Sequence, residues 1–455
     1  MEASVNIRSF HLKSVIVTGM GVFSDSYNLY AISLVYYSAL FYLNLDSIQA
    51  SLVTASSFFG AAFGAILFGA IADRIGRKPM YGIDLLLIFF GAIMQLFAGS
   101  FTLLFASRII LGFGIGGDYV MSPVIMAENS DTANRGKLMA ISFSIMFLMG
   151  ATLSAFVDQV SMLLLVPSFS WKVVLAFGAV PSLFVIYYRR KIPETPRFTA
   201  RIMGQDAGGL NIVGDPGLTG RLGPDRVPYR ERLMRSLPMV LVGSLLWVLY
   251  DTYSSTFTIY GPITIASNLG LTPVMFTYAA VFIAGLPGTL LSVYLIDRVG
   301  RKKLVVAGYA GVFAALLLYA ILLSSPSFYG LGNGAIVNGS LIGYAAFLGF
   351  SFYLLNYLFS AAGPATVIGG TIIVPELVAT KVRASGQAIN VFIDKMAAAL
   401  AISSFPAFLS QFGLAAVIGF YAAIAAGSSV IMHFAIPETK ERLLEEISGE
   451  IAEAQ

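Results

Sequence analysis

Four charged side chains lie inside long apolar stretches of this sequence, each in a different stretch: Asp25, Asp118, Asp251 and Lys395. A charge at the centre of a bilayer costs about 2.5 kcal/mol or more, so such residues usually line the path of an ion or a substrate. A buried carboxylic acid keeps its proton more readily than an exposed one, and a buried ammonium group attracts an anion. The set therefore predicts that protons and an anion share a path through a membrane.

The apolar stretches that position these residues dominate the composition. Of the 455 residues, 57% are hydrophobic and 11% are charged, and the mean hydropathy is +0.81, whereas soluble domains carry roughly 25% charged residues. A helix needs about 20 apolar residues to cross a bilayer. The sequence therefore predicts an all-α membrane protein with twelve transmembrane helices, at 14–43, 50–72, 81–99, 101–126, 138–163, 170–188, 235–266, 272–296, 304–323, 340–369, 387–410 and 412–435.

The distribution of basic residues indicates how these helices cross the membrane. Nearly all of the 28 Lys and Arg residues fall at the termini and in loops on one side of the predicted helices. Basic loops face the cytoplasm, so we expect a multi-pass plasma-membrane protein with both termini in the cytoplasm. This bias accounts for the pI ≈ 9.0 and gives no reason to expect a nucleic-acid partner. The expected partners are the lipid bilayer, protons and a small-molecule substrate.

Residues for enzymatic or metal chemistry are scarce. The sequence has no cysteine, and its two histidines, His11 and His433, lie near the ends of the apolar region. No thiolate or metal-ligand cluster, no Ser-His-Asp arrangement and no phosphate-binding loop can be assembled from such a set. We therefore expect neither enzymatic activity nor a cofactor or metal, and we expect transport to run on gradients.

An internal repeat organises the chain. The string Asp-Arg-Ile-Gly-Arg-Lys at 73–78 returns as Asp-Arg-Val-Gly-Arg-Lys at 297–302, and Pro-Glu-Thr at 193–195 returns at 437–439. Cognate loops in the same order predict two parallel six-helix halves, with the substrate site near the midplane between them. The expected domains are an N-terminal half at 1–188, a cytoplasmic linker at 189–234, a C-terminal half at 235–436 and a cytoplasmic tail at 437–455.

The repeated loops also carry paired charges on the predicted cytoplasmic side. In each half, a glutamate precedes an arginine by seven residues, as Glu128 and Arg135 and as Glu376 and Arg383. These charges could pair when the cytoplasmic side is shut, or they could serve only to orient the protein. We expect gating by eight residues: Asp73, Arg77, Glu128, Arg135, Asp297, Arg301, Glu376 and Arg383.

These strings identify the superfamily that the chain resembles. The Asp-Arg-x-Gly-Arg-Lys loop is the best-known mark of the major facilitator superfamily, and the resemblance covers nearly the whole length. Two further strings, Gly-Gly-Asp-Tyr at 116–119 and Glu-Glu-Ile-Ser-Gly-Glu at 445–450, are similar to the phosphate:proton symporter family. That resemblance implies the major facilitator fold and proton-coupled transport of inorganic phosphate by alternating access.

The resemblance also implies roles for individual residues. The family's proton-transferring acids fall on Asp25 and Asp118. Its phosphate site uses a tyrosine, a tryptophan and aspartate four apart, and a lysine, which fall on Tyr119, Trp247, Asp251 and Lys395. Asp251 combines both roles in this interpretation, because a protonated Asp251 would donate a hydrogen bond to an anion held by Lys395 and would repel that anion after losing its proton.

Several positions depart from the family's pattern. A glutamine is replaced by Met146, an asparagine before a Gly-Pro pair by Ala361, and an acid by Asn28. A tyrosine is replaced by Ser255, which we retain in the predicted substrate site, with Tyr253 as a possible substitute. These changes remove neutral hydrogen-bonding groups but leave the charged residues in place. They support proton coupling better than they support phosphate as the cargo.

Other interpretations of single residues remain open. An ion pair of Asp118 with Arg108 is disfavoured, since ten residues on one helix span about 15 Å, and Arg108 is expected to be structural. Lys395 could pair only with its neighbour Asp394. Asp84 is expected at a gate or on the surface, and the tail is expected to form a surface helix.

Two other functions remain open. One is a proton-coupled carrier of another small solute, such as an organic acid or a sugar. The other is a nutrient sensor that has kept the fold without transporting anything.

Overall fold

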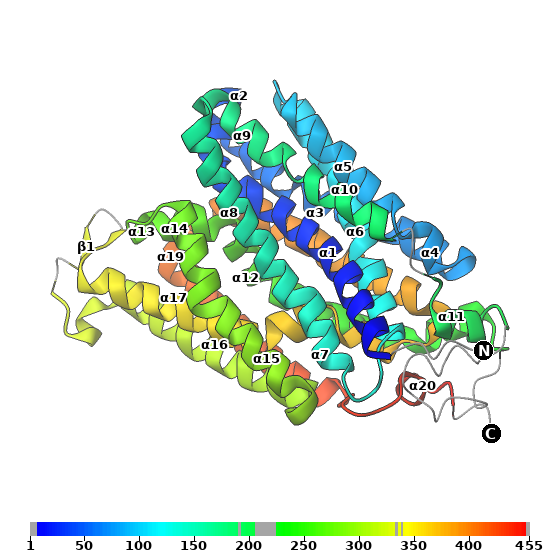
Figure 1. Ribbon diagram of the computed structural model, residues 1–455. Coiled ribbons are helices and arrows are strands. Elements are labelled where there is room, and N and C mark those ends of the chain that lie inside the picture. Colours follow the sequence, from blue (N-terminus) through cyan, green and yellow to red (C-terminus); the bar gives the residue numbers. More distant parts are fainter. Residues whose placement is uncertain (1–6, 190–192, 205–223, 333–334, 338–339, 452–455) are drawn as a thin grey trace.

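The computed structural model describes residues 7–189, 193–204, 224–332, 335–337 and 340–451 as a bundle of long helices (Figure 1). The first part of the chain forms α1 (Ile7–Leu34), α2 (Tyr36–Leu43), α3 (Ser47–Ile75), α4 (Arg77–Met80), α5 (Ile83–Leu96), α6 (Phe101–Glu128), α7 (Arg135–Ala140), η1 (Ile141–Ile145), α8 (Met146–Leu164), α9 (Pro167–Ala176), α10 (Ala179–Arg189) and α11 (Pro196–Arg201).

The second part repeats this helical character. It forms α12 (Tyr229–Tyr260), η4 (Gly261–Ile265), α13 (Ala266–Asn268), α14 (Pro273–Ala279), η5 (Ala280–Gly285), α15 (Leu286–Val299), α16 (Arg301–Ser324), η6 (Pro326–Tyr329), α17 (Tyr344–Ala362), η7 (Ala365–Gly369), α18 (Ile373–Leu377), η8 (Thr380–Val382), α19 (Arg383–Ala435) and α20 (Leu444–Ile447). Two short strands, β1 (Ile336–Val337) and β2 (Ser340–Leu341), pair antiparallel between η6 and α17.

The predicted number of spanning helices is confirmed within the described residues. Ten helical segments are long and apolar enough to cross a membrane. The longest contains α19, which is two helices merged across Gly413, whose φ of 77° is not helical. The 28-residue α1 is also long enough to span. Counting α1, and α19 as two, gives the twelve helices that the sequence predicts.

Glycines allow the closest helix packing in the bundle, between α3 and α6. A Cβ added to Gly112 would lie 2.2 Å from the carbonyl oxygen of Ser57, and one added to Gly116 would lie 2.0 Å from that of Ala61. Small residues let helix backbones approach in this way in membranes. This close contact of α3 and α6 at Gly112 and Gly116, which we call the α3–α6 seam, fixes the position of α6, which carries both Asp118 and Tyr119.

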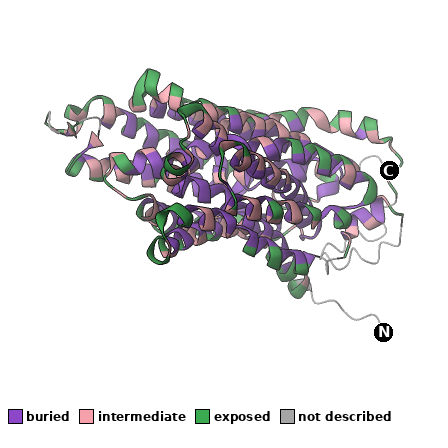
Figure 2. Cartoon of the chain, turned by 90° about the horizontal axis from the view of Figure 1, so that it is seen from above, coloured by how far each residue is buried: buried purple, intermediate pink, exposed green. Residues whose placement is uncertain are grey.

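The outer surface of the bundle is apolar. Buried residues gather along the inward faces of the helices and exposed residues along the outward faces (Figure 2). Large apolar side chains are among the exposed ones, including Phe41, Leu163 and Phe434, which are 77%, 79% and 80% exposed. Exposed apolar area on this scale marks a surface that another apolar phase covers, as expected of a protein surrounded by lipid.

Short helices gather at one end of the bundle. In Figure 1, α4, α7, α11 and α20 all lie toward the lower right of the molecule, opposite α2, α9 and β1. We call this the network end, because it carries the ion-pair network described below. Within the predicted cytoplasmic linker at 189–234, residues 190–192 and 205–223 lie outside the described residues.

Candidate functional site

A cavity lies among the long helices and brings the predicted substrate residues together. Its lining includes all five of them: Tyr119, Trp247, Asp251, Ser255 and Lys395. They come from three helices, α6, α12 and α19. On α12, Trp247 and Asp251 share one helix face because residues four apart are neighbours there.

Lys395 lies at the centre of the charged groups at this cavity. Its Nζ donates a hydrogen bond to Oδ2 of Asp251 at 2.9 Å and also lies 2.9 Å from Oδ2 of Asp394. The same Nζ lies 4.6 Å from the ring centroid of Tyr119 and 4.6 Å from that of Trp247. Rings at this distance attract a desolvated cation through their electron-rich faces. Lys395 is therefore held between two carboxylates and two aromatic rings.

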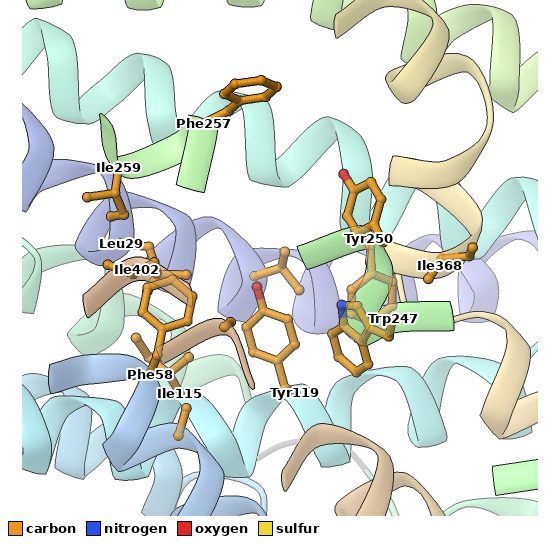
Figure 3. Close-up of a cluster of buried hydrophobic side chains, with 14 of the residues drawn as sticks. Leu29, Phe58, Ile115, Tyr119, Trp247, Tyr250, Phe257, Ile259, Ile368 and Ile402 are labelled. Atoms are coloured by element: carbon orange, nitrogen blue, oxygen red, sulfur yellow. The ribbon is translucent and has the colours of Figure 1, made fainter. Parts of the chain in front are cut away.

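Figure 3 shows how the aromatic residues surround this position. Tyr119 and Trp247 approach each other, with ring centroids 6.0 Å apart, and Tyr250 lies next to Trp247 (Figure 3). Trp247 is 1% exposed, and its indole nitrogen has no hydrogen-bond partner among the described residues. Tyr250 and Ser255 both line the cavity. The cavity thus offers one cation and several neutral donors to a ligand.

Some of the residues that depart from the family's pattern line the central cavity, and others do not. Ser255 and Ala361 line the cavity. Met146 is absent from the lining; its side chain instead packs against α1, where a Cβ added to Gly19 would lie 2.7 Å from its Cγ. Tyr253 is 1% exposed and lines a neighbouring cavity with Tyr30 and Tyr357. Tyr253 therefore does not replace the missing tyrosine in the lining of the central cavity.

Asp118 belongs to a different cluster, centred on Arg189 at the end of α10. Arg189 donates to Oδ1 of Asp118 at 2.6 Å and to Oδ2 of Asp84 at 2.7 Å, and its guanidinium lies 3.7 Å from the ring centroid of Tyr81. Ser122 donates to the same oxygen of Asp118 at 2.5 Å. Of the two places expected for Asp84, the surface is wrong, because its side chain is fully buried in this cluster.

Asp25 completes this cluster without a counterion of its own. It is 1% exposed, and neither carboxylate oxygen accepts a hydrogen bond from the described residues. On α1 it lies one helical turn after Gly21, where an added Cβ would lie 2.2 Å from Oδ2 of Asp118 and 1.8 Å from a guanidinium nitrogen of Arg189. Oδ2 of Asp118 also lacks a partner among these residues. A protonated Asp25 could therefore donate to Asp118, whereas an ionised Asp25 would face it as a like charge.

Arg108 takes the structural role expected of it. It donates to the carbonyl oxygen of Val53 at 3.1 Å, to Oγ of Ser57 at 3.0 Å and to Oε1 of Gln95 at 3.5 Å. These bonds tie α6 to α3 and α5. As expected, Arg108 does not pair with Asp118.

At the network end, the eight predicted gating residues form two matching sets of contacts. In one set, Asp73 accepts from the backbone N–H groups of Ala384 and Ser385 at 3.2 and 2.7 Å. In the other, Asp297 accepts from those of Gly136 and Lys137 at 3.1 and 2.7 Å. Each aspartate therefore binds the first turn of a helix from the other part of the chain, where the helix dipole favours a negative charge.

The glutamates of the repeat bind arginines from both parts of the chain. Glu128 pairs with Arg77 at 3.2 Å and with Arg383 at 2.9 Å. Glu376 pairs with Arg301 at 3.1 Å and with Arg135 at 2.8 Å. Thr195 donates to Glu128, and Thr439 donates to Glu376. The strings Pro-Glu-Thr thus contribute directly to the two ion-pair sets.

The tail also joins this network. Arg197 donates to Oε1 of Glu445 at 2.8 Å, and Arg201 pairs with Glu450 at 3.2 Å. Both glutamate side chains are fully buried. The expected surface helix is therefore wrong, because α20 has four residues, and Glu445 of α20 and the following Glu450 turn inward to arginines of α11.

Sequence reasoning missed the role of Arg189 and the direct contact between Lys395 and Asp251. Arg189 was expected in the linker, but α10 continues to include it, and it is 1% exposed. A basic residue directly at the end of an apolar stretch was the available signal. A local pair of Lys395 with Asp394 was one of the open alternatives, and it is present. The contact of Lys395 with Asp251, which joins α19 to α12, could not be read from spacing along one helix.

Comparison with known proteins places the chain in a family. The model of the sugar (and other) transporter family matches residues 15–450. A probable inorganic phosphate transporter 1-6 of Arabidopsis thaliana is 28% identical over 97% of this chain and 94% of its own length. The inorganic phosphate transporter 1-6 of Oryza sativa subsp. japonica is 29% identical over 98% and 93%.

A solved structure agrees in fold. The major facilitator superfamily proton:xylose symporter XylE, bound to 6-bromo-6-deoxy-D-glucose, superposes with a TM-score of 0.81 and 19% identity, covering 97% of this chain and 99% of that one. These relatives and neighbours are transporters rather than enzymes, and the twelve helices have the major facilitator fold. The chain belongs to the sugar (and other) transporter family.

Proposed function

We propose that this protein is a proton-coupled symporter of inorganic phosphate that works by alternating access. Lys395 carries the proposal, because it places a buried cation against the central cavity, between Asp251, Tyr119 and Trp247. The matched transporters from Arabidopsis and rice are named for inorganic phosphate, which supports this anion as the cargo. In this proposal, Lys395 binds the phosphate, and Tyr119, Trp247 and Ser255 contact it.

Two groups of acids would carry the coupled protons. Asp251 shares the cavity with the substrate, so its protonation would supply a hydrogen-bond donor and remove a like charge. Asp25 and Asp118 lie in the separate cluster around Arg189. Because Arg189 and Ser122 both bind Asp118, we assign the exchanged proton of this cluster to Asp25. Asp118 would accept the hydrogen bond of the protonated form.

Alternating access would use the network end as the gate. We propose that this end faces the cytoplasm of a plasma membrane, that the halves at 1–188 and 235–436 rock against each other, and that the linker at 189–234 and the tail at 437–455 are cytoplasmic. The eight gating residues link the two halves in the contacts described above. These contacts would hold the cytoplasmic side shut and break when it opens.

Another small solute remains a second candidate cargo. Ala361 in the cavity lining, together with the hydroxyl groups of Ser255 and Tyr250, leaves a pocket with one cation and many neutral groups. A carboxylate or a sugar could use the same groups. The buried cation Lys395 in the cavity lining favours an anion over a sugar.

Uptake by proteoliposomes tests the proposal. Purified protein in liposomes with an inward proton gradient should accumulate radiolabelled phosphate, and collapse of the gradient should abolish accumulation. Unlabelled phosphate should compete, whereas sulfate, xylose and acetate should compete poorly. Absence of phosphate uptake, together with uptake of one of these competitors, would contradict phosphate as the cargo. Counterflow without a gradient separates a transporter from a sensor.

A further inference from the structure

Asp394 is a buried acid that the proposed transport mechanism does not yet use. Its side chain is fully buried, and it is absent from the residues that line the central cavity. Its two oxygens accept no hydrogen bond of good geometry from the described residues. Its close polar contact is the ion pair at 2.9 Å with Lys395. A carboxylate in such a position needs an explanation, because burying a charge without full compensation is costly.

The balance of charge around Lys395 suggests an explanation for the buried Asp394. Lys395 supplies one positive charge, and Asp251 and Asp394 supply two negative charges when both are ionised. All three side chains are at most 8% exposed. The triad is then net negative beside a cavity that should receive an anion. One bound proton makes the triad neutral and releases Lys395 from one of its two carboxylates.

The position of the two acids separates their roles. Asp251 lines the cavity and can touch a ligand, whereas Asp394 lies outside the lining and acts through Lys395. We propose, on the basis of the phosphate symport proposed above, that Asp394 competes with the transported oxyanion for Lys395, so that the cavity accepts the anion only after the triad has bound a proton. Asp394 is thus a positioning residue that ties substrate affinity to pH.

The proton follows a simple route in this scheme. It leaves the outer solution and binds one carboxylate of the triad, converting it to a carboxylic acid, and it departs to the other side when the anion leaves. The titratable groups facing Asp394 are Lys395 on its own helix and Asp251 on α12. Tyr119 of α6 faces Lys395, and Tyr309 of α16 faces Asp251. None of these carries a second positive charge that could replace Lys395 as the anion's partner.

Phosphate affinity as a function of pH tests the inference. Binding of inorganic phosphate to the purified full-length protein would be measured from about pH 5 to about pH 8, for the wild type and for Asp394→Asn. Wild-type affinity should fall as the pH rises and both acids ionise. The variant keeps a neutral Lys395–Asp251 pair at high pH, so it should bind about tenfold more tightly than the wild type there and equally at low pH. Phosphate itself loses a proton in this range, but it does so alike for both proteins.

Two further variants isolate the role of Asp394. Asp394→Glu should restore the wild-type pH dependence, since it restores the charge. Asp158→Asn removes another buried acid, 2% exposed on α8 and outside the cavity lining, and should follow the wild type at every pH. Thermal unfolding without ligand shows that each variant is folded, and Asp394→Asn should fold because Lys395 keeps Asp251.

The outcomes separate the two proposals. Equal pH profiles for Asp394→Asn and the wild type, or a loss of affinity in the variant that is uniform across pH, would overturn the role of Asp394 while leaving phosphate transport intact. Absence of phosphate binding by the wild type at every pH would contradict the proposed function itself, and the role of Asp394 with it.

Discussion

Asp25 and Asp118 are neighbours in one cluster but differ in their partners, and this difference separates their roles. Asp118 accepts from Arg189 at 2.6 Å and from Ser122 at 2.5 Å, whereas Asp25 accepts from none of the described residues. A paired carboxylate resists protonation, and an unpaired buried one favours it. We therefore propose that the carboxyl group without a counterion, that of Asp25, carries the proton.

Asp25→Asn should separate exchange from accumulation. Asparagine mimics a permanently protonated acid, so the variant should exchange phosphate between two pools but should not concentrate it against its gradient. Proteoliposome uptake and counterflow measure the two activities on one preparation. If Asp25→Asn still drives uphill uptake, another group carries the proton.

Asp118→Asn should affect stability as well as coupling. The sequence predicts that this variant keeps binding and exchange and loses uphill uptake. The ion pair adds a structural cost, since removing one partner of a buried pair costs about 3 kcal/mol or more. The apparent unfolding temperature in detergent should fall further for Asp118→Asn than for Asp158→Asn. Equal unfolding temperatures would show that Arg189 is satisfied by Asp84 alone.

Lys395 should decide whether the cavity binds an anion. Lys395→Ala should abolish phosphate binding, and Lys395→Arg should retain part of it, because the charge remains while the geometry changes. Stabilisation of the purified protein by phosphate in a thermal unfolding assay reports binding through mass action. Normal stabilisation of the Ala variant would show that the lysine only neutralises Asp251 and Asp394.

At the scale of the helices, the contact between α3 and α6 leaves no room for added volume. A methyl group at Gly116 would lie 2.0 Å from the carbonyl oxygen of Ala61, so Gly116→Ala must displace one helix. Overpacking of this kind costs about 1–3 kcal/mol. Gly427→Ala is the matched control, because nothing lies within 4 Å of a Cβ added to that exposed glycine of α19. If the unfolding temperatures of the two variants fall equally, or do not fall at all, close packing of α3 against α6 at Gly116 is contradicted.

The contact between the tail and α11 should depend on pH. Burial alone would raise the pKa of Glu445, but Arg197 and Arg383 hold the pKa below its ordinary value. A carboxyl group with a lowered folded-state pKa stabilises the fold above its unfolded pKa of about 4.3, and that stability is lost as the pH falls through the folded value. From neutral pH to below about pH 4, the wild type should therefore lose more thermal stability than Glu445→Gln. Parallel curves would show that this pair contributes nothing.

For the molecule as a whole, the network end should control which side opens. Arg383→Ala removes one of the two arginines on Glu128, so the halves should separate more often at that end. The chain has no cysteine, so Ala388→Cys would introduce the single thiol of the protein. Residue 388 packs against α3, because a Cβ added to Gly69 of α3 would lie 2.3 Å from the Cβ of Ala388. Maleimide labelling at residue 388 should quicken in the Arg383→Ala background.

A surface variant provides the control for this labelling experiment. Arg235→Ala removes an exposed pair with Glu231 on α12, whose side chains are 54% and 48% exposed, and exposed pairs contribute about 0–1 kcal/mol. Labelling of Cys at 388 should therefore be unchanged in that background. Slow labelling in both backgrounds would show that the ion pairs do not hold this end shut.

Much of the architecture was readable from composition because a bilayer constrains it strongly. Apolar stretches must become helices to satisfy their backbone groups in lipid, so the length of these stretches predicted the twelve spans. Spacing and resemblance predicted the repeat and the five substrate residues that are found in the cavity lining. The loop charges were also predicted as a set, and the contacts pair them across the two parts of the chain.

Contacts between distant helices were decided only by the folded structure. Arg189 meets Asp84 because α10 packs beside α5, and its side chain also reaches Asp118 of α6. Lys395 meets Asp251 because α19 packs beside α12. A helix period tells which residues share a face, but it does not tell which helix that face will meet. The sequence supplied the charged groups and their positions along the helices, whereas packing brought most of them to a counterion and left Asp25 without one among the described residues.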